Sequence, residues 1–270
     1  MIAVELSKLV RSRRTWVTIA VIDALPVVVA VLLSLTDLGP RPGTGPAFLS
    51  AVLADGALYP LAAMAMILPL FLPAAVAVTA GDAIAGEAQQ GTLRYVLIRP
   101  VGRTRLLVAK LIAVMAFVLL TLLVVAATAF VLGLALLGNG DATTSTTFSG
   151  TSLTHGQLVV RTGLALAYAL LSMLGVASVA LFLSTIVRSP LAAAMGTLAL
   201  LIGSSLLLTL DAANALQPYL VTRYWLSFVD LFRDPILWHD VVRGVLLQAG
   251  YVVVFLAAAW ANFVTKDITD

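Results

Sequence analysis

The sequence contains no cysteine and little charge. Without cysteine, the chain forms no disulfide and holds no metal ion through thiolates. Charged residues are 11% of the 270 residues, against 61% hydrophobic, whereas a soluble globular domain carries roughly 25% charged residues. Several apolar runs exceed the roughly 18 residues that separate a membrane span from a buried core helix. We therefore predict an all-α integral membrane protein, because in lipid each segment must satisfy its own backbone polar groups.

Six spans are predicted, and short loops leave the whole chain, 1–270, as one transmembrane domain. Residues 1–15 place apolar and charged side chains on opposite faces, which is typical of an amphipathic helix lying in the membrane surface. Residues 211–243 carry charges too often for a span, and their aromatic residues are expected at headgroup depth. They are predicted to form broken external helices that are re-entrant or interfacial. The predicted spans cover residues 16–36, 56–80, 106–138, 158–187, 190–210 and 244–264.

The distribution of Lys and Arg predicts the orientation. Eleven of them fall on the side of the N-terminus and five on the other side. By the positive-inside rule, both termini are predicted to be cytoplasmic in a multi-pass protein of the plasma membrane. The net charge of +3 is explained by topology and by contact with anionic membrane lipid, so we expect no nucleic acid partner.

Two spans contain residues that are unusual in lipid. Pro69 and Pro73 are predicted to kink the second span, which fits either a gating helix or the ordinary frequency of proline in membrane helices. Asp23 in the first span costs several kcal/mol unless it faces protein or water. It lies about two turns from the predicted end of that span, so snorkelling or pairing with a neighbour is favoured over a substrate role. Asp23 is kept as a possible intramembrane polar site.

Residues 81–105 form a basic interval between the second and third spans. Within it, Thr92 can cap a helix of about two turns that Pro100 ends, and Thr104 is predicted to cap the third span. The apolar face of the short helix would consist of Leu93, Val96 and Leu97. The side chains expected to point to water or to an acidic partner are Arg94 and Arg99.

This interval follows the pattern E-x-x-x-G-T-L-R-x-x-L-x-x-P-V-x-R, and an apolar run containing A-K comes after it. The matching residues are Glu87, Gly91, Thr92, Leu93, Arg94, Leu97, Pro100, Val101, Arg103, Ala109 and Lys110. The pattern resembles the first cytoplasmic loop of type-2 ABC transporter permeases, which export drugs, antibiotics, lipids and polysaccharides. That family also has an amphipathic N-terminal helix, six spans and a broken external helix before the last span.

The resemblance implies that the short helix is a coupling helix that inserts into a groove of a separate nucleotide-binding ATPase subunit. It implies two such subunits, a second permease of the same or another kind, and a substrate route along spans one, two and five. ATP and Mg would be bound by the ATPase, since this chain has no G-x-x-x-x-G-K-[ST] motif and no cofactor of its own is expected. The residues implied to shape the loop or contact the ATPase are Glu87, Gly91, Thr92, Leu93, Arg94, Val96, Leu97, Arg99, Pro100 and Arg103.

Other functions stay open at this point. The same loop residues also fit a plain helix cap and a topology signal. An intramembrane enzyme is disfavoured because H-E-x-x-H and G-x-S-x-G motifs are missing and the histidines, His155 and His239, lie in separate loops. A secondary transporter or channel normally needs more intramembrane ionisable residues than Asp23. A regulatory subunit that binds the ATPase without forming a pathway also fits, whereas a permease would export a lipophilic substrate.

Overall fold

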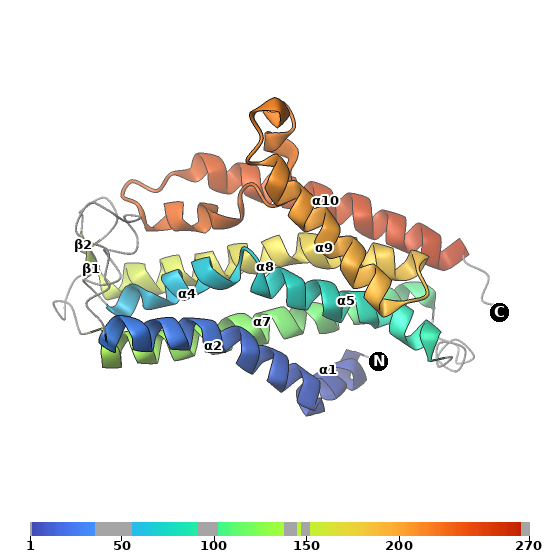
Figure 1. The fold of residues 1–270 in the computed structure, drawn as a ribbon, viewed down its shortest axis with the longest axis horizontal. Coiled ribbons are helices and arrows are strands. Elements are labelled where there is room, and N and C mark those ends of the chain that lie inside the picture. The colour runs from blue at the N-terminus through green and yellow to red at the C-terminus, as the bar shows by residue number, and fades with distance from the viewer. Residues whose placement is uncertain (1, 36–55, 91–101, 138–144, 147–151, 266–270) are drawn as a thin grey trace.

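The computed structural model describes residues 2–35, 56–90, 102–137, 145–146 and 152–265. Its long helices run side by side in an elongated bundle (Figure 1). Six of the described helices are long and apolar enough to cross a membrane, which confirms the predicted all-helical membrane fold.

The chain begins with a short amphipathic helix joined to the first span. α1 (Ile2–Arg11) and α2 (Arg13–Leu35) meet at Ser12, the one non-helical residue between them. Across this junction the indole nitrogen of Trp16 donates a hydrogen bond to the carbonyl of Val10 at 2.8 Å. The predicted amphipathic helix and first span are thus both present, and the span begins three residues earlier than predicted.

The second crossing departs from the prediction. η1 (Gly56–Leu58) leads into α4 (Tyr59–Ile67), and after a three-residue turn the chain continues as α5 (Phe71–Gln89). Pro69 lies in the turn and has no N–H to continue the helical ladder. Pro73 is the third residue of α5, where an N–H has no intrahelical partner to lose. The prediction of one span with two kinks was therefore wrong, because the prolines produce a single break.

The helix after this break is also longer than expected. Residues 81–89 belong to α5, although the sequence assigned them to the cytoplasmic loop because of their charges. The loop between helices is therefore shorter than the predicted 81–105.

The third crossing is the longest helix of the chain's described part. α7 (Arg103–Leu136) has 34 residues, about 51 Å at 1.5 Å per residue, whereas the hydrocarbon core is about 30 Å thick. One end of α7 must therefore extend beyond the hydrocarbon. After it, β1 (Ser145–Thr146) and β2 (Ser152–Leu153) pair antiparallel, with Ser145 opposite Leu153.

The fourth and fifth crossings form a tight hairpin, in keeping with predicted spans that are only two residues apart, 158–187 and 190–210. α8 (His155–Ile186) begins with a capping box between Thr154 and Gln157. α9 (Pro190–Leu207) begins with Pro190 at its first position, and the Ser189 hydroxyl accepts a hydrogen bond from a backbone N–H of the first turn. These caps explain why both helices start where they do.

Before the last crossing the chain forms three short 3₁₀ helices, as expected of a broken helix. They are η2 (Asp211–Ala213), η3 (Gln217–Tyr219) and η4 (Trp225–Phe232). α10 (Trp238–Thr265) then completes the bundle. It begins six residues before the predicted 244, so the last part of the predicted external segment belongs to the final helix.

The aromatic residues of this segment are less exposed than predicted. Trp225, Phe228 and Phe232 are 3%, 0% and 1% exposed and η4 packs against α8 and α10. Tyr219 and Trp238 do remain exposed. The apolar face of η4 is thus covered by protein, and the headgroup depth of these aromatic residues stays a prediction.

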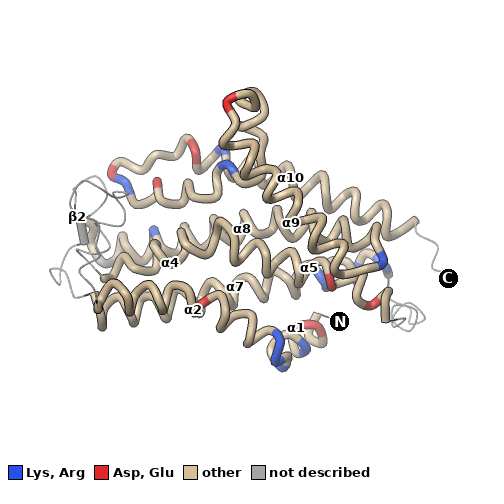
Figure 2. Tube along the Cα trace, viewed as in Figure 1, with Lys and Arg blue, Asp and Glu red and all other residues tan. Residues whose placement is uncertain are grey.

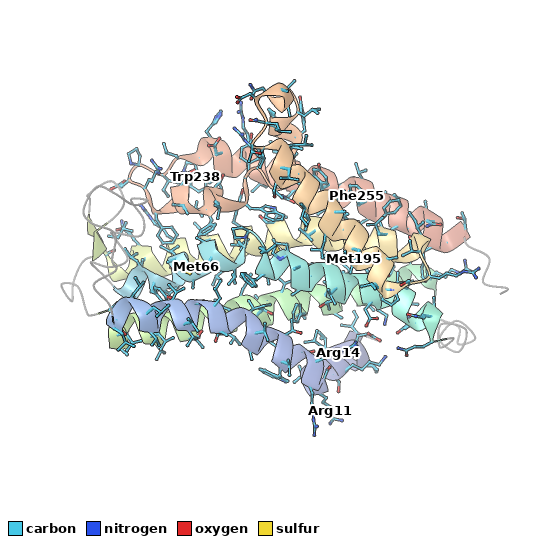
Figure 3. The ribbon with its side chains drawn as sticks, viewed as in Figure 1. Arg11, Arg14, Met66, Met195, Trp238 and Phe255 are labelled. Carbon is cyan, nitrogen blue, oxygen red and sulfur yellow. The ribbon has the colours of Figure 1, made fainter. Side chains whose placement is uncertain are left out.

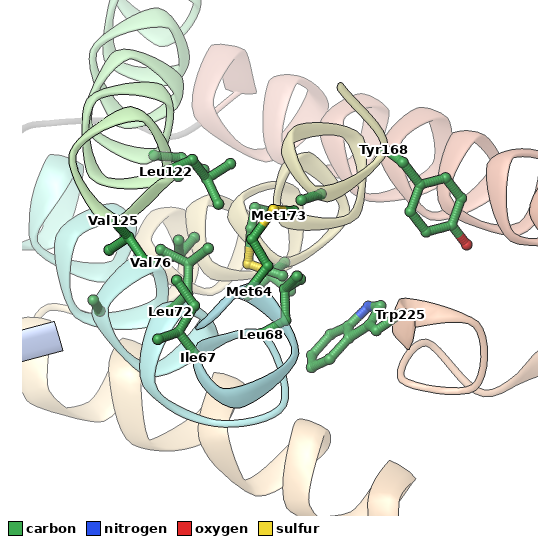
Figure 4. Close-up of a cluster of buried hydrophobic side chains, with 14 of the residues drawn as sticks. Met64, Ile67, Leu68, Leu72, Val76, Leu122, Val125, Tyr168, Met173 and Trp225 are labelled. Carbon is green, nitrogen blue, oxygen red and sulfur yellow. The ribbon is translucent and has the colours of Figure 1, made fainter. Parts of the chain in front are cut away.

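The core lies where α4, α5, α7 and α8 meet. Figure 4 shows Met64, Leu72, Leu122 and Met173 pointing toward one another from these four helices, and each is fully buried. Outward-facing apolar side chains are abundant on the same helices, as a lipid environment requires. The bundle is thus a protein core surrounded by a lipid-compatible surface.

Several segments far apart in sequence meet at one end of the bundle, which we call the terminal end. α1, the end of α5, the start of α7, the start of α9 and the end of α10 lie there (Figure 1). Charged residues gather at this end and along the segment before α10, whereas most of the long helices between are uncharged (Figure 2). Arg11 projects from α1 away from the other helices (Figure 3).

Candidate functional site

Residues 91–101 connect α5 to α7 at the terminal end, and most of the expected ATPase contacts fall in this connection. Two of the expected contacts, Glu87 and Arg103, flank it and are described by the structure. The expected contacts that lie outside the described residues are Gly91, Thr92, Leu93, Arg94, Val96, Leu97, Arg99 and Pro100.

Glu87 belongs to a cluster of charged side chains that joins three helices. The ammonium group of Lys110 on α7 donates hydrogen bonds to Glu87 on α5 and, at 3.1 Å, to Glu5 on α1. The side chain of Lys110 is 7% exposed, and those of Glu5 and Glu87 are 16% and 19% exposed. We call these three residues the Lys110 triad. It connects α1 to both helices that lead into residues 91–101.

The charges of the triad stabilise one another. Burial raises the pKa of the Glu5 carboxyl, but the charge of Lys110 and the hydrogen bonds from Lys8 and Lys110 outweigh burial and hold this pKa below its ordinary value. Glu87 lies in the last turn of α5, where the helix dipole disfavours a carboxylate. The ammonium group of Lys110 offsets that cost. The lowered pKa keeps the Glu5 carboxyl ionised beside Lys110.

Arg103 ties the start of α7 to the end of α10. One guanidinium nitrogen donates hydrogen bonds to the carbonyls of Phe263 at 3.2 Å and Val264 at 2.7 Å. These carbonyls belong to the last turn of α10, where helical carbonyls have no intrahelical donor and a cation is favourable. The structure thus gives Arg103 a role within the chain, and its contact with an ATPase stays a prediction.

Thr104 reinforces the same junction in an unexpected way. Its hydroxyl accepts a hydrogen bond from the indole N–H of Trp260 at 2.9 Å. The prediction that Thr104 caps the third span was wrong, because Gly102 occupies the cap position of α7 and no side chain caps that end.

Ser184 on α8 forms hydrogen bonds with the backbone of α5 just before Glu87. The hydroxyl of Ser184 donates to the carbonyl of Gly81 at 2.7 Å and accepts from the backbone N–H groups of Ala85 at 2.9 Å and Ile84 at 3.2 Å. In an undisturbed α-helix, the N–H of Ala85 would bond only to the carbonyl of Gly81. The serine hydroxyl shares this pair, which marks a point where α5 can bend.

A cavity of about 640 Å³ lies beside the triad. Its walls come from α1, α2, α5, α7 and the start of α9, and all three triad residues line it. Thr15, Thr18 and Thr79 contribute hydroxyl groups, whereas Val114 and Phe117 are apolar. The cavity therefore combines charged, hydroxyl-bearing and apolar walls.

Asp23 is paired inside the bundle. Its carboxylate accepts a hydrogen bond from the hydroxyl of Thr128 on α7 at 2.6 Å. Because α2 begins at Arg13, Asp23 lies about 15 Å along that helix at 1.5 Å per residue. Asp23 therefore has a neighbour within the chain, one of the alternatives that the sequence offered, and its role as an intramembrane polar site stays a prediction.

Side chains that could hold a metal ion do not cluster in the described residues. Within ranges 2–35, 56–90, 102–137 and 152–265, no group of three His, Asp or Glu side chains could hold a metal ion. His239 is exposed in the first turn of α10. The terminal end therefore holds charged groups that fix helices together.

Sequence reasoning missed Glu5, Ser184 and the role of Lys110. Lys110 was noted only as part of the resemblance, although it lies within the predicted span 106–138. An ionisable residue in an apolar run normally has a charged partner, and this signal pointed to a carboxylate without identifying which. Glu5 is 105 residues away along the chain, so periodicity could not find it.

Comparison with known proteins agrees with this architecture. A search of curated proteins finds no match. A family model described as "ABC-2 family transporter protein" matches residues 1–204, which include α1, the first four crossings and most of α9. This match covers more than half of the chain, so the chain belongs to the ABC-2 family of transporter proteins.

Proposed function

We propose that this chain is the permease subunit of an ABC exporter and that a separate ATPase drives it through residues 91–101. Family membership supports the permease role. The observation that carries the docking proposal is the Lys110 triad, because it fixes α1 and the two helices beside this connection in one arrangement. A force applied to residues 91–101 would act directly on that arrangement.

The proposal assigns the terminal end to the cytoplasm, with both termini on that side of the plasma membrane. The ATPase subunit, expected in two copies, binds ATP and Mg, and this chain contributes positioning rather than phosphate chemistry. A second permease subunit completes the pathway. The basic residues near the start of the chain, such as Arg11 and Arg14, are exposed and favour contact with anionic lipid.

The substrate is proposed to be a lipophilic molecule that follows spans one, two and five. The cavity beside the triad supports this route, because α2, α5 and α9 contribute to its walls. Its threonine hydroxyls can hydrogen-bond a polar group, while residues such as Phe117 cover an apolar part. An amphiphilic molecule matches both kinds of wall.

The test replaces Leu93 and Leu97 with aspartate. Both residues belong to the apolar face of the predicted coupling helix, so two charges there should abolish co-purification of the ATPase while the permease stays in the membrane. Tyr95→Asp is the matched control, because at 100° per residue it adds a charge to the opposite face. Unchanged co-purification of the ATPase with the double variant would refute docking through this face.

A further inference from the structure

We propose that Lys110 is a positioning residue that locks α1 to the two helices beside residues 91–101, so that these three elements move as one body. Lys110 bonds to Glu5 and Glu87 at the same time. Glu5 lies on α1 and Glu87 in the last turn of α5, whereas Lys110 lies in the second turn of α7.

α1 depends on this lock because it has few other attachments. The helix buries none of its residues, and Leu9 is its apolar side chain packed against the core. Its connection to α2 is the single non-helical residue Ser12, which allows the two helices to change their angle. The hydrogen bond from Trp16 to Val10 joins α1 only to α2, whereas the bond between Glu5 and Lys110 ties α1 to α7.

Two lysines contact the same carboxylate in different surroundings. Lys8 lies on α1 itself and is 62% exposed, and it contacts Glu5 at 3.0 Å. Lys110 comes from another helix, is 7% exposed and contacts Glu5 at 3.1 Å. Exposed ion pairs contribute little and are screened by salt, whereas a charge held away from water requires its partner. Lys8 therefore provides a natural control for Lys110.

The residues of the proposed lock also form part of the cavity wall. Glu5, Glu87 and Lys110 all line it, together with Leu9 and Ser12 at the α1 end. On the basis of the proposed function, a displacement of residues 91–101 by the ATPase would move α1 and change the mouth of the cavity. This step rests on ATPase docking, whereas the lock itself does not.

The test measures how readily α1 separates from the bundle. Because the chain has no cysteine, Leu9→Cys introduces a single thiol on the packed side of α1, and a water-soluble maleimide reports its exposure in membrane vesicles. Glu5→Gln removes the negative charge that Lys110 contacts on α1 and so weakens that bond, but it keeps the pair between Lys110 and Glu87. We expect it to raise the labelling rate about tenfold, the effect of losing one charge-assisted hydrogen bond.

Two further variants separate positioning from general structural damage. Lys8→Met, which removes the exposed partner of the same carboxylate, should leave the labelling rate within about twofold of the parent. Glu5→Asp keeps the charge and should restore most of the protection. An unchanged rate in Glu5→Gln, or an equal rise in Lys8→Met, would overturn the proposed lock.

The complex with the ATPase then tests the consequence for coupling. ATP should change the labelling rate of Leu9→Cys when Glu5 is present and should have no effect in Glu5→Gln, although the ATPase still co-purifies. An ATP effect that survives in Glu5→Gln would show that α1 moves independently of Lys110. Loss of co-purification in the Leu93 and Leu97 double variant concerns docking alone, so the two proposals fail separately.

Discussion

Replacing Lys110 with methionine leaves two carboxylates without their common cation. Glu5 would keep only the exposed Lys8, and the pair from Lys110 to Glu87 would be lost. Removing one partner of a buried ion pair costs about 3–5 kcal/mol. Because the carboxylates retain 16% and 19% exposure, we expect the lower end, about 3 kcal/mol. Lys8→Met removes an exposed pair and should cost at most about 1 kcal/mol.

Thermal unfolding of the purified protein in detergent measures this difference. For a chain of this size, 1 kcal/mol lowers the midpoint by about 2–4 °C, so Lys110→Met should lower it by about 6–12 °C and Lys8→Met by less than about 4 °C. All variants are heated at one rate, since unfolding of membrane proteins is often irreversible.

A third variant identifies the cause of the loss. A triple variant that combines Lys110→Met with Glu5→Gln and Glu87→Gln removes every charge of the triad. It should recover most of the midpoint, because no carboxylate charge remains beside the lost ammonium group. Equal midpoints for Lys110→Met and Lys8→Met, or no recovery in the neutral triple variant, would refute the electrostatic reasoning.

Two other predictions follow from the terminal end. Arg103→Met removes both hydrogen bonds to the last turn of α10, so hydrogen exchange should accelerate at residues 263–265 and stay unchanged in the first half of that helix; equal exchange in parent and variant would contradict this. Burial raises the pKa of Glu5, but Lys110 and Lys8 together lower it below its ordinary value of 4.5. Its contribution is therefore present above pH 4.5 and lost as pH falls below that value, so the difference in thermal midpoint between the parent and Glu5→Gln should stay constant above about pH 4.5 and shrink below it, and a loss of this difference near pH 7 would contradict the assignment.

The crossings of the membrane were predictable because their signal is local. Long apolar runs define a span from its own composition, and caps such as Ser189 before Pro190 lie beside the helix that they start. The last helix began earlier than predicted because Trp238 and Asp240 resemble interfacial residues, yet both fit the first turn of a helix.

The break between α4 and α5 shows what the proline rule predicts correctly and what it does not. Pro69 and Pro73 each interrupt a helical ladder when considered alone. Together they require one turn, after which Pro73 falls in the first turn of a new helix and disturbs nothing. The sequence therefore located the disturbance correctly and gave its form wrongly.

The Lys110 triad and the Arg103 junction were beyond sequence reasoning for a physical reason. Arg103 and Val264 are 161 residues apart, and Lys110 and Glu5 are 105 apart. Such contacts depend on how whole helices pack, which one sequence without related sequences does not specify. The need for a partner was visible at Lys110 and at Asp23, but its identity came only from the fold.

The central claim is that a separate ATPase binds residues 91–101, and site-specific photo-crosslinking tests it most directly. A photoreactive amino acid at Leu97 should form an adduct in cells with a protein that carries a G-x-x-x-x-G-K-[ST] motif. The same group at Val131, which is 63% exposed on the lipid-facing part of α7, should not form it. Absence of the adduct at position 97, or its equal formation at position 131, would contradict the claim.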